Sequence, residues 1–323
     1  MSKRIKILLV VVVAVLLIWS VAWYIIAGQV RTQVAALAQA DGVTTPRVVC
    51  ENLNVTGYPF RFDVDCSPAR ITIEDVSADI AGIRASVLVY RPTHVLASAL
   101  GPLSVSDAFT GSRNALDWSG LEASLRLDDW RISRLSVSAH DLVWTNPLMG
   151  EAPIATATLS ELHLLDIPEQ HDPDRHLASL AGYARTQNLV YPALTLTDTN
   201  SEIQLELTGL PDDVRIWNDP LLLRTMQAVD ATLRIVSARA TDGASTLTAE
   251  GEIQLDPQGQ LEGQISINST GVAERVGPYL QEPIRTLVLG TPAADGSHTN
   301  ILSFRAGGVF SGLIPIGAVP PLF

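Results

Sequence analysis

The first pattern along the chain is an unbroken apolar run near the N-terminus. Residues 7–28 contain Ser20 as their only polar side chain, and about 20 apolar residues are enough to cross the core of a bilayer as a helix. Only Arg31 follows the run closely, whereas three basic residues precede it: Lys3, Arg4 and Lys6. The positive-inside rule therefore predicts a cytoplasmic N-terminus 1–6, a transmembrane signal anchor 7–28 and an exported remainder.

The end of the run also fits a second interpretation. Ser20-Val21-Ala22 matches the small-x-small rule for cleavage by signal peptidase, which would release a soluble exported protein. The apolar run continues beyond Ala22, however, and the pair Trp23 and Tyr24 is typical of an aromatic belt at a membrane interface. We expect the uncleaved anchor, with the cleaved form as the alternative.

Residues 29–42 predict a juxtamembrane helix. The helical pattern continues through 29–40, and Asp41-Gly42 ends it, because the glycine suits a left-handed C-cap. A single helix over 5–40 would be about 54 Å long, compared with ~30 Å for the bilayer core. Either this helix holds the exported domain away from the membrane, or residues 29–40 pack against that domain.

Alternation of apolar and polar residues dominates the rest of the chain, 43–323. In 121–127 and 203–208 every second side chain is apolar, which is the pattern of a strand with one buried face. The other strand candidates are 70–75, 83–91, 102–106, 131–138, 153–165, 193–197, 231–240 and 300–314. Helical patterns cover only 219–229 and 272–289, which Pro278 interrupts, and 175–188 is ambiguous.

Strands thus far outnumber the helices that could connect parallel strands. We therefore predict a mainly β fold: a large curved antiparallel meander, closed as a half-barrel, groove or sandwich, with a few short helices. Short turns such as Thr241-Asp242-Gly243 join the strands. The one plausible linker, His171-Asp172-Pro173-Asp174, suggests a boundary between two sub-sheets near 168–176 within the exported β-domain 43–323.

The clearest hairpin lies in 245–268. Asp256-Pro257-Gln258-Gly259 has the chemistry of a type I turn followed by a left-handed glycine. That turn pairs Leu255 with Leu261 and residue 253 with 263, which keeps the apolar side chains on one face. Turn chemistry and face pattern therefore predict the same register.

A second hairpin pattern encloses the two cysteines of the chain. Strand 47–55, a turn at Gly57-Tyr58-Pro59 and strand 60–66 would place Cys50 directly opposite Cys66 if the loop has three residues. In an exported domain the two should form a disulfide bond buried in the hairpin. A redox pair or half of a metal site are the alternatives, and neither CxxC spacing nor a nearby histidine supports them.

Charge and lysine content exclude several functions. Thirty-four acidic residues against 22 basic ones give a net charge of -12, and so acidic a surface repels nucleic acids. Lysine occurs only at Lys3 and Lys6, which excludes a phosphate-binding P-loop and a lysine nucleophile in the main body. No GxSxG, HExxH, EF-hand or dinucleotide-binding motif is present either. We predict no cofactor.

Two groups of titratable residues remain. The segment 171–176 holds four possible ligands for a divalent metal, although its proline and polarity fit an exposed turn better: His171, Asp172, Asp174 and His176. Asp63 and Asp65 alternate with apolar residues, so the simpler interpretation is a strand face exposed to solvent. A catalytic acid–base pair is the alternative. The apolar C-terminal segment 312–323 is either a last strand with a tail along the sheet or a lip over an apolar groove.

Several motifs in order resemble a known family. They are the N-terminal anchor, Cys50 with Gly57-Tyr58-Pro59-Phe60-Arg61-Phe62 and Cys66, then Tyr90-Arg91-Pro92-Thr93-His94-Val95, and finally Ile314-Pro315-Ile316-Gly317 with Pro320-Pro321-Leu322. Together they look like an uncharacterised family of bacterial envelope proteins, mostly alphaproteobacterial, that is known only as a domain of unknown function. Strand–turn units such as 251–256 also resemble the AsmA-like β-groove proteins of envelope biogenesis. The resemblance implies a single-pass protein of the bacterial inner membrane with a periplasmic main domain, and it implies no catalytic residue.

Three hypotheses about function follow. The first is a non-enzymatic envelope protein whose periplasmic β-domain binds a lipid-like apolar ligand or another envelope component. The second is an anchored periplasmic hydrolase or metal-dependent enzyme that uses dispersed Asp and His residues, which a convergent pocket of titratable groups would favour. The third is a structural scaffold with a fully packed sheet.

Overall fold

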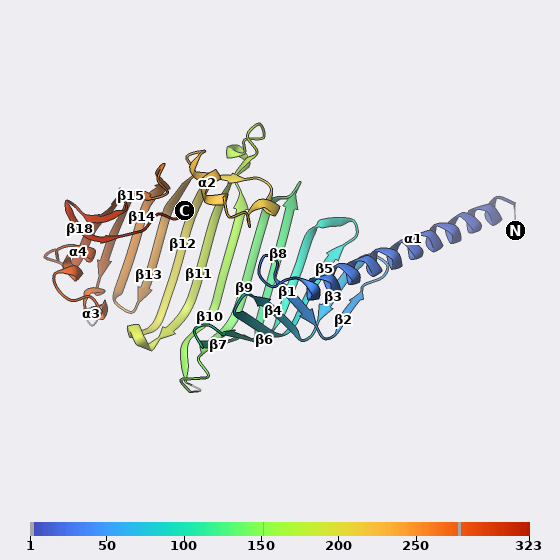
Figure 1. The fold of residues 1–323 in the computed structure, drawn as a ribbon, viewed down its shortest axis with the longest axis horizontal. Coiled ribbons are helices and arrows are strands. Elements are labelled where there is room, and N and C mark those ends of the chain that lie inside the picture. Colours follow the sequence, from blue (N-terminus) through green and yellow to red (C-terminus); the bar gives the residue numbers. More distant parts are fainter. Residues whose placement is uncertain (1–2, 151, 277–278) are drawn as a thin grey trace. The chain divides into compact units, whose positions relative to one another are not determined.

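The computed structural model describes residues 3–150, 152–276 and 279–323. One long helix precedes a mainly β structure with a few short helices, and all strand pairings given below are antiparallel (Figure 1). The predicted fold class is therefore confirmed. Two compact units divide the chain, the first over residues 1–123 and 144–152 and the second over 124–143 and 153–323. The division passes through strands β8 (Gly120–Asp128) and β9 (Arg131–Thr145), and residues 168–176 lie inside the second unit.

The first unit begins with helix α1 (Lys3–Ala36), which the short helix η1 (Leu37–Gln39) follows. The predicted helix therefore continues beyond the apolar run, but its last α-helical residue is Ala36 rather than a residue near 40. In the described part of the chain, α1 is the one helix long and apolar enough to cross a membrane. The remaining elements of this unit are β1 (Arg47–Cys50), β2 (Leu53–Thr56), β3 (Arg61–Cys66), β4 (Ala69–Ile73), β5 (Val76–Leu88), β6 (Arg91–Asp107) and β7 (Arg113–Asp117).

Helix α1 packs against the strands much earlier than expected. Trp23 and Ala27 are buried in one cluster with Val55 of β2, and Phe62 and Val64 of β3 pack against it. The indole of Trp23 stacks on the ring of Phe62, with 5.3 Å between the ring centroids. One of the two expected arrangements had residues 29–40 packed on the domain. The observed contact is larger, because Trp23 and Ala27, in the last third of segment 7–28, are buried in it as well.

The disulfide bond between Cys50 and Cys66 is present, but the predicted register is wrong. Strand β2 pairs with β3 so that Leu53 lies opposite Cys66, and β1 pairs with β4 so that Cys50 lies opposite Ala69. The loop is longer than three residues: Thr56 pairs with Asp63, and the Arg61 N–H donates to the Gly57 carbonyl. The bond spans diagonally 5.2 Å between Cα atoms.

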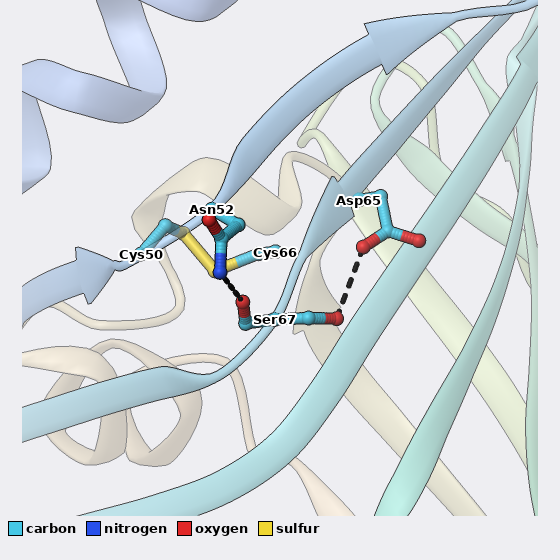
Figure 2. The surroundings of a disulfide bond; sticks show 5 residues. All are labelled: Cys50, Asn52, Asp65, Cys66 and Ser67. Carbon is cyan, nitrogen blue, oxygen red and sulfur yellow. Dashed lines mark hydrogen bonds between the residues drawn. A yellow bond between two sulfur atoms is a disulfide. The ribbon is translucent and has the colours of Figure 1, made fainter.

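Both strands of this hairpin break beside the disulfide, which makes the diagonal link possible. Asn52 donates from Nδ2 to the Ser67 carbonyl at 2.8 Å, and the Ser67 hydroxyl donates to Asp65 at 3.0 Å (Figure 2). The first of these bonds holds the chain between β1 and β2 against the chain between β3 and β4, and the second fixes the Ser67 side chain on β3. Cys66 is buried, as expected for the apolar face of the hairpin, but Cys50 is only half-buried, so the bond is less enclosed than predicted.

The second unit is a meander in which each strand from β10 to β18 pairs with the next (Figure 1). Its strands after β9 are β10 (Pro153–Asp166), β11 (Leu177–Tyr191), β12 (Leu196–Pro211), β13 (Thr232–Asp242), β14 (Ser245–Leu255), β15 (Leu261–Thr270), β16 (Ser297–Arg305), β17 (Gly308–Ser311) and β18 (Ile314–Ala318). Its helices are η2 (Pro168–Gln170), η3 (Pro192–Leu194), η4 (Val214–Ile216), α2 (Leu222–Gln227), α3 (Ala273–Val276) and α4 (Ile284–Leu289).

The predicted β14–β15 hairpin is confirmed in detail. Leu255 lies opposite Leu261 and Ile253 opposite Gly263. Gly259 has a φ of +73°, and its N–H donates to the Asp256 carbonyl. The left-handed glycine therefore fixes the register that the sequence pattern predicts.

Other predictions for this unit need correction. Segment 300–314, expected as one strand, contains parts of three strands because the chain turns at Ala306-Gly307 and again at Gly312, all with positive φ. Residues 193–197 begin as the helix η3, and the ambiguous segment 175–188 belongs to a long strand, β11. Helix α2 covers Leu222–Gln227, which is shorter at both ends than the predicted helical segment 219–229. The predicted interruption at Pro278 lies outside the described residues.

One end of the second unit is closed by a hydrophobic core under α2. Ile132, Leu180 and Leu210 are buried there, and Trp217 and Met226 pack against them. The C-terminal tail follows the strand ends as expected for a tucked tail: Leu322 N–H donates to the Gly259 carbonyl, and the Phe323 ring lies under the Arg224 guanidinium.

Candidate functional site: an apolar pocket under helix α3

The four candidate metal ligands do not converge in the structure. Asp172 accepts hydrogen bonds from the backbone N–H groups of Asp174 and Arg175, which makes it part of a turn. His171 and His176 instead approach the carboxylate of Asp212, at 3.4 and 3.5 Å. Within residues 3–150, 152–276 and 279–323, no group of three or more His, Cys, Asp or Glu side chains is arranged to hold a metal ion.

An arginine that the sequence did not single out organises this region. Arg131, at the start of β9, lies 2.7 Å from the Nδ1 atom of His171 and donates to Asp128 at 3.0 Å. Its Nε atom is 3.2 Å from a carboxylate oxygen of the buried Asp166, an ion pair without the alignment of a hydrogen bond. The arrangement places one guanidinium against two carboxylates and links the ends of three strands, β8, β9 and β10.

Asp63 and Asp65 also take separate partners. Asp63 is buried, pairs with Arg61 at 2.7 Å and accepts a hydrogen bond from Ser86. Asp65 pairs with Arg84 at 2.8 Å, and this guanidinium, with the Ser67 hydroxyl, lowers the pKa of the Asp65 carboxyl. The solvated face expected here is therefore an ion-paired face.

One face of the β10–β16 sheet is hollowed, and the lining of the hollows mixes polar and apolar side chains. Three adjoining hollows of about 340, 450 and 540 Å³ follow this face, joined through Val236, Glu250 and Ser266. Their polar lining comes from the non-apolar side of the alternation, for example Gln204, Glu252 and Gln264. The hollows along the strands therefore differ from a continuous apolar channel.

A smaller pocket of about 180 Å³ has an almost wholly apolar lining. It lies where β12 begins, β13 ends and β14 begins, and the short helices η3 and α3 complete its wall. We call it the α3 pocket, and its apolar lining consists of Leu194, Leu196, Ala240, Leu247, Val272 and Val276. Leu196, Ala240 and Leu247 belong to the strands, whereas Leu194 comes from η3 and the two valines from α3 and the residue before it, so the pocket forms where the short helices meet the end of the sheet.

A buried ion pair connects α3 to the strands beside the pocket. Arg275 of α3 donates to the Asp242 carboxylate at 3.0 Å, and the two side chains are 25% and 7% exposed. Arg275 also donates to the Thr195 carbonyl at 2.8 Å and to the Ser245 hydroxyl at 3.0 Å. One side chain thus links α3 to the η3–β12 junction and to the β13–β14 turn.

The Asp242 carboxylate is held in its ionised form. The Thr197 N–H and the Thr199 hydroxyl donate to it at 2.9 and 2.7 Å. These hydrogen bonds, together with the Arg275 guanidinium, hold the pKa of the Asp242 carboxyl well below its usual range. At neutral pH the pocket wall therefore contains a paired charge beneath an apolar lining.

Sequence reasoning identified the parts of this site but not their assembly. Thr241-Asp242-Gly243 was identified only as a turn, and 272–289 only as an interrupted helix. The available signal was Arg275, a lone cation beside Val272 and Val276. Because its partner lies 33 residues earlier in the chain, neither alternation nor helical periodicity could indicate the pairing.

Comparisons with known proteins place the chain in a family but give it no activity. No curated protein and no solved structure matches it. A family model described as "Uncharacterized protein conserved in bacteria (DUF2125)" matches residues 23–320, which include every element from the end of α1 to β18. The chain therefore belongs to this uncharacterised bacterial family, DUF2125.

Proposed function

We propose that this protein is a non-enzymatic component of the cell envelope, anchored in the inner membrane by α1, whose periplasmic β-domain binds a lipid-like apolar ligand. The observation that carries the proposal is the α3 pocket, with its almost wholly apolar lining. Apolar cavities bind by excluding water from hydrocarbon surface, and they need few polar groups to do so. The anchor supports the proposal because it keeps the domain beside a source of lipid.

The size of the pocket limits what it holds. A cavity of about 150 Å³ accommodates a ring such as benzene, and the α3 pocket, at about 180 Å³, is of similar size. It therefore takes a short terminal stretch of an acyl chain, with the remainder of the lipid outside. A single apolar side chain of another envelope protein would occupy the same space and is the alternative occupant.

The experiment maps where an acyl chain binds. The full-length protein is reconstituted in nanodiscs with a fatty acid that carries a photoreactive diazirine near its methyl end, and cross-linked peptides are located by mass spectrometry. We expect adducts on peptides that contain 194–199, 240–247 or 272–276. Ala240→Phe, which fills the pocket, should reduce these adducts at least tenfold, whereas Ala294→Phe, a matched change in an exposed turn of the same unit, should not.

Two results would contradict the proposal. Adducts confined to α1 and its surroundings would show that the probe reports only the membrane. Unchanged adducts in an Ala240→Phe protein that unfolds in urea like the parent would place the acyl chain elsewhere. A third result would favour the alternative occupant. In that case the fatty acid gives no adducts in the pocket, whereas an envelope protein that carries the diazirine on an apolar side chain cross-links to the pocket residues.

A further inference from the structure

Helix α1 meets the β2–β3 hairpin well before its apolar run ends. The indole of Trp19 donates to the Pro59 carbonyl at 3.0 Å, and the Ser20 hydroxyl lies 2.8 Å from the Tyr58 hydroxyl. We call residues 57–61 the hairpin tip. The N-terminal part of α1 extends beyond the strands of its unit (Figure 1).

The length of α1 before this contact is too short to cross a bilayer. Twelve residues, 7–18, separate Lys6 from Trp19, and they span about 18 Å of helix. The hydrocarbon core is ~30 Å thick. With Lys6 at one boundary, the opposite boundary is reached near residue 26, about 10 Å beyond Trp19. Tilting the helix increases this overlap, because the rise along the membrane normal becomes smaller.

We infer that the hairpin tip and the adjoining β5–β6 turn enter the outer leaflet beside α1, so that bilayer lipid is the partner of this surface. The inference rests on α1 crossing the membrane and is independent of the α3 pocket. It gives the protein a second membrane contact, made by strands and turns rather than by the anchor helix.

The side chains on this surface are those expected at a membrane interface. Phe60 and Tyr90 are 64% and 68% exposed. They belong to neighbouring turns, because the N–H of Val89, the residue before Tyr90, donates to the Phe60 carbonyl. Tyr58 is also exposed and stacks with the exposed ring of Tyr24 on α1, with 6.1 Å between centroids. Aromatic side chains concentrate at the level of lipid head groups because they combine an apolar ring with a polar edge.

Most backbone carbonyls of the tip are hydrogen-bonded within the protein and do not need water as a partner. Four of its carbonyls accept hydrogen bonds from protein donors: Gly57 from Arg61 N, Pro59 from Trp19 Nε1, Phe60 from Val89 N and Arg61 from Trp23 Nε1. An unsatisfied carbonyl in hydrocarbon costs several kcal/mol. Two of these donors are indoles of α1, so the helix supplies what water would supply to an exposed loop.

Charged residues set the depth of insertion. Arg61 is largely exposed and pairs with Asp63 at 2.7 Å, and Arg91 follows Tyr90 as another exposed cation. Long arginine side chains extend toward the head groups while their aliphatic parts remain in apolar surroundings. The tip therefore lies within the outer leaflet, with its arginine side chains directed toward the lipid carbonyl and phosphate groups, rather than at the bilayer centre.

The test measures lipid contact at single positions. The two native cysteines are joined in a disulfide bond, so one introduced cysteine provides a unique thiol for a bimane fluorophore. The variants are Phe60→Cys, Tyr90→Cys, Val12→Cys within α1, and Phe109→Cys as the matched control, since Phe109 is 87% exposed in a turn of the same unit. The full chain is reconstituted in phosphatidylethanolamine–phosphatidylglycerol vesicles, and quenching by nitroxide-labelled lipid is compared with quenching by aqueous iodide.

We expect the ratio of lipid quenching to iodide quenching to be at least threefold higher at positions 60 and 90 than at 109, with position 12 highest. If positions 60 and 90 behave like 109 while 12 is quenched by lipid, α1 is inserted and the inference is wrong. If position 12 is also open to iodide, α1 does not cross the membrane and the inference fails with it. Counting one free thiol per chain confirms that each variant keeps its disulfide, and neither outcome affects the test of the α3 pocket.

Discussion

Replacing Asp242 by Asn tests whether the buried ion pair holds α3 on the sheet. The substitution keeps the shape of the side chain but removes its charge, so Arg275 loses its partner at 3.0 Å. Removing one partner of a buried pair typically costs 3–5 kcal/mol. Because the Arg275 side chain is 25% exposed and the new amide oxygen still accepts one hydrogen bond, we expect about 3 kcal/mol, at the lower end of this range.

The dependence on pH identifies the charge as the cause. The folded protein lowers the pKa of Asp242, so its stabilisation is fully present above the unfolded-state pKa of about 3.9. It is lost as the pH falls below that value toward the folded-state pKa. Asn does not titrate, so the stability difference between parent and variant should be constant above about pH 5 and should narrow below about pH 4.

The assay is urea unfolding of the full-length protein in detergent, followed by tryptophan fluorescence at several pH values. Asp174→Asn is the matched control, because it makes the same change at an exposed aspartate of the same unit, and it should alter stability by less than 0.5 kcal/mol, roughly the limit for surface changes. The double variant Asp242→Asn, Arg275→Met should cost less than the sum of the single variants. An Asp242→Asn protein as stable as the parent at pH 7, or a difference that does not narrow in acid, would refute the reasoning.

Three further sets of substitutions test other parts of the fold. Replacing Cys50, Cys66 or both by Ser should lower the free energy of unfolding by about 3 kcal/mol, because the unfolded chain gains loop entropy. The double variant should be no less stable than either single one, and labelling of both thiols in the parent without reductant would show that the bond is absent. Trp23→Ala should destabilise the first unit by about 3–5 kcal/mol, measured by urea unfolding, whereas Tyr24→Ala, an exposed aromatic beside it, should not. Gly259→Ala should lower the free energy of unfolding by roughly 1–2 kcal/mol, because φ at this position is +73° and a residue with a Cβ is unfavourable in left-handed backbone. An unchanged thermal midpoint would show that the turn adopts another conformation without cost.

Local chemistry predicted much of the fold. The β14–β15 register followed from Gly259 and from Leu255 opposite Leu261, because a left-handed glycine and an alternating face constrain a short turn to one solution. The long strand β11 was ambiguous because its central segment, Ala181 to Arg185, mixes small, aromatic and charged residues without clear alternation. Its identity comes from pairing with β10 and β12, which are long-range contacts.

The cysteine hairpin shows how a correct bond can follow from a wrong register. Equal spacing about Gly57-Tyr58-Pro59 assumed a three-residue loop, whereas Thr56 pairs with Asp63. The sequence could not indicate this, because the longer loop is stabilised by Trp19 and Trp23 of α1, about 40 residues earlier. The α3 pocket was missed for a similar reason, since Asp242 and Arg275 meet only when β13 and α3 are both in place.

The N-terminal end of α1 has a practical consequence for measuring orientation. Lys3 and Lys6 are the lysines of this chain, so the side-chain amines lie together before the apolar part of one helix. An amine-reactive reagent that cannot cross membranes will therefore modify intact cells or inverted vesicles according to the side on which that end lies. Each molecule carries its own reporter of sidedness, and the remainder of the chain contributes no lysine background to the signal.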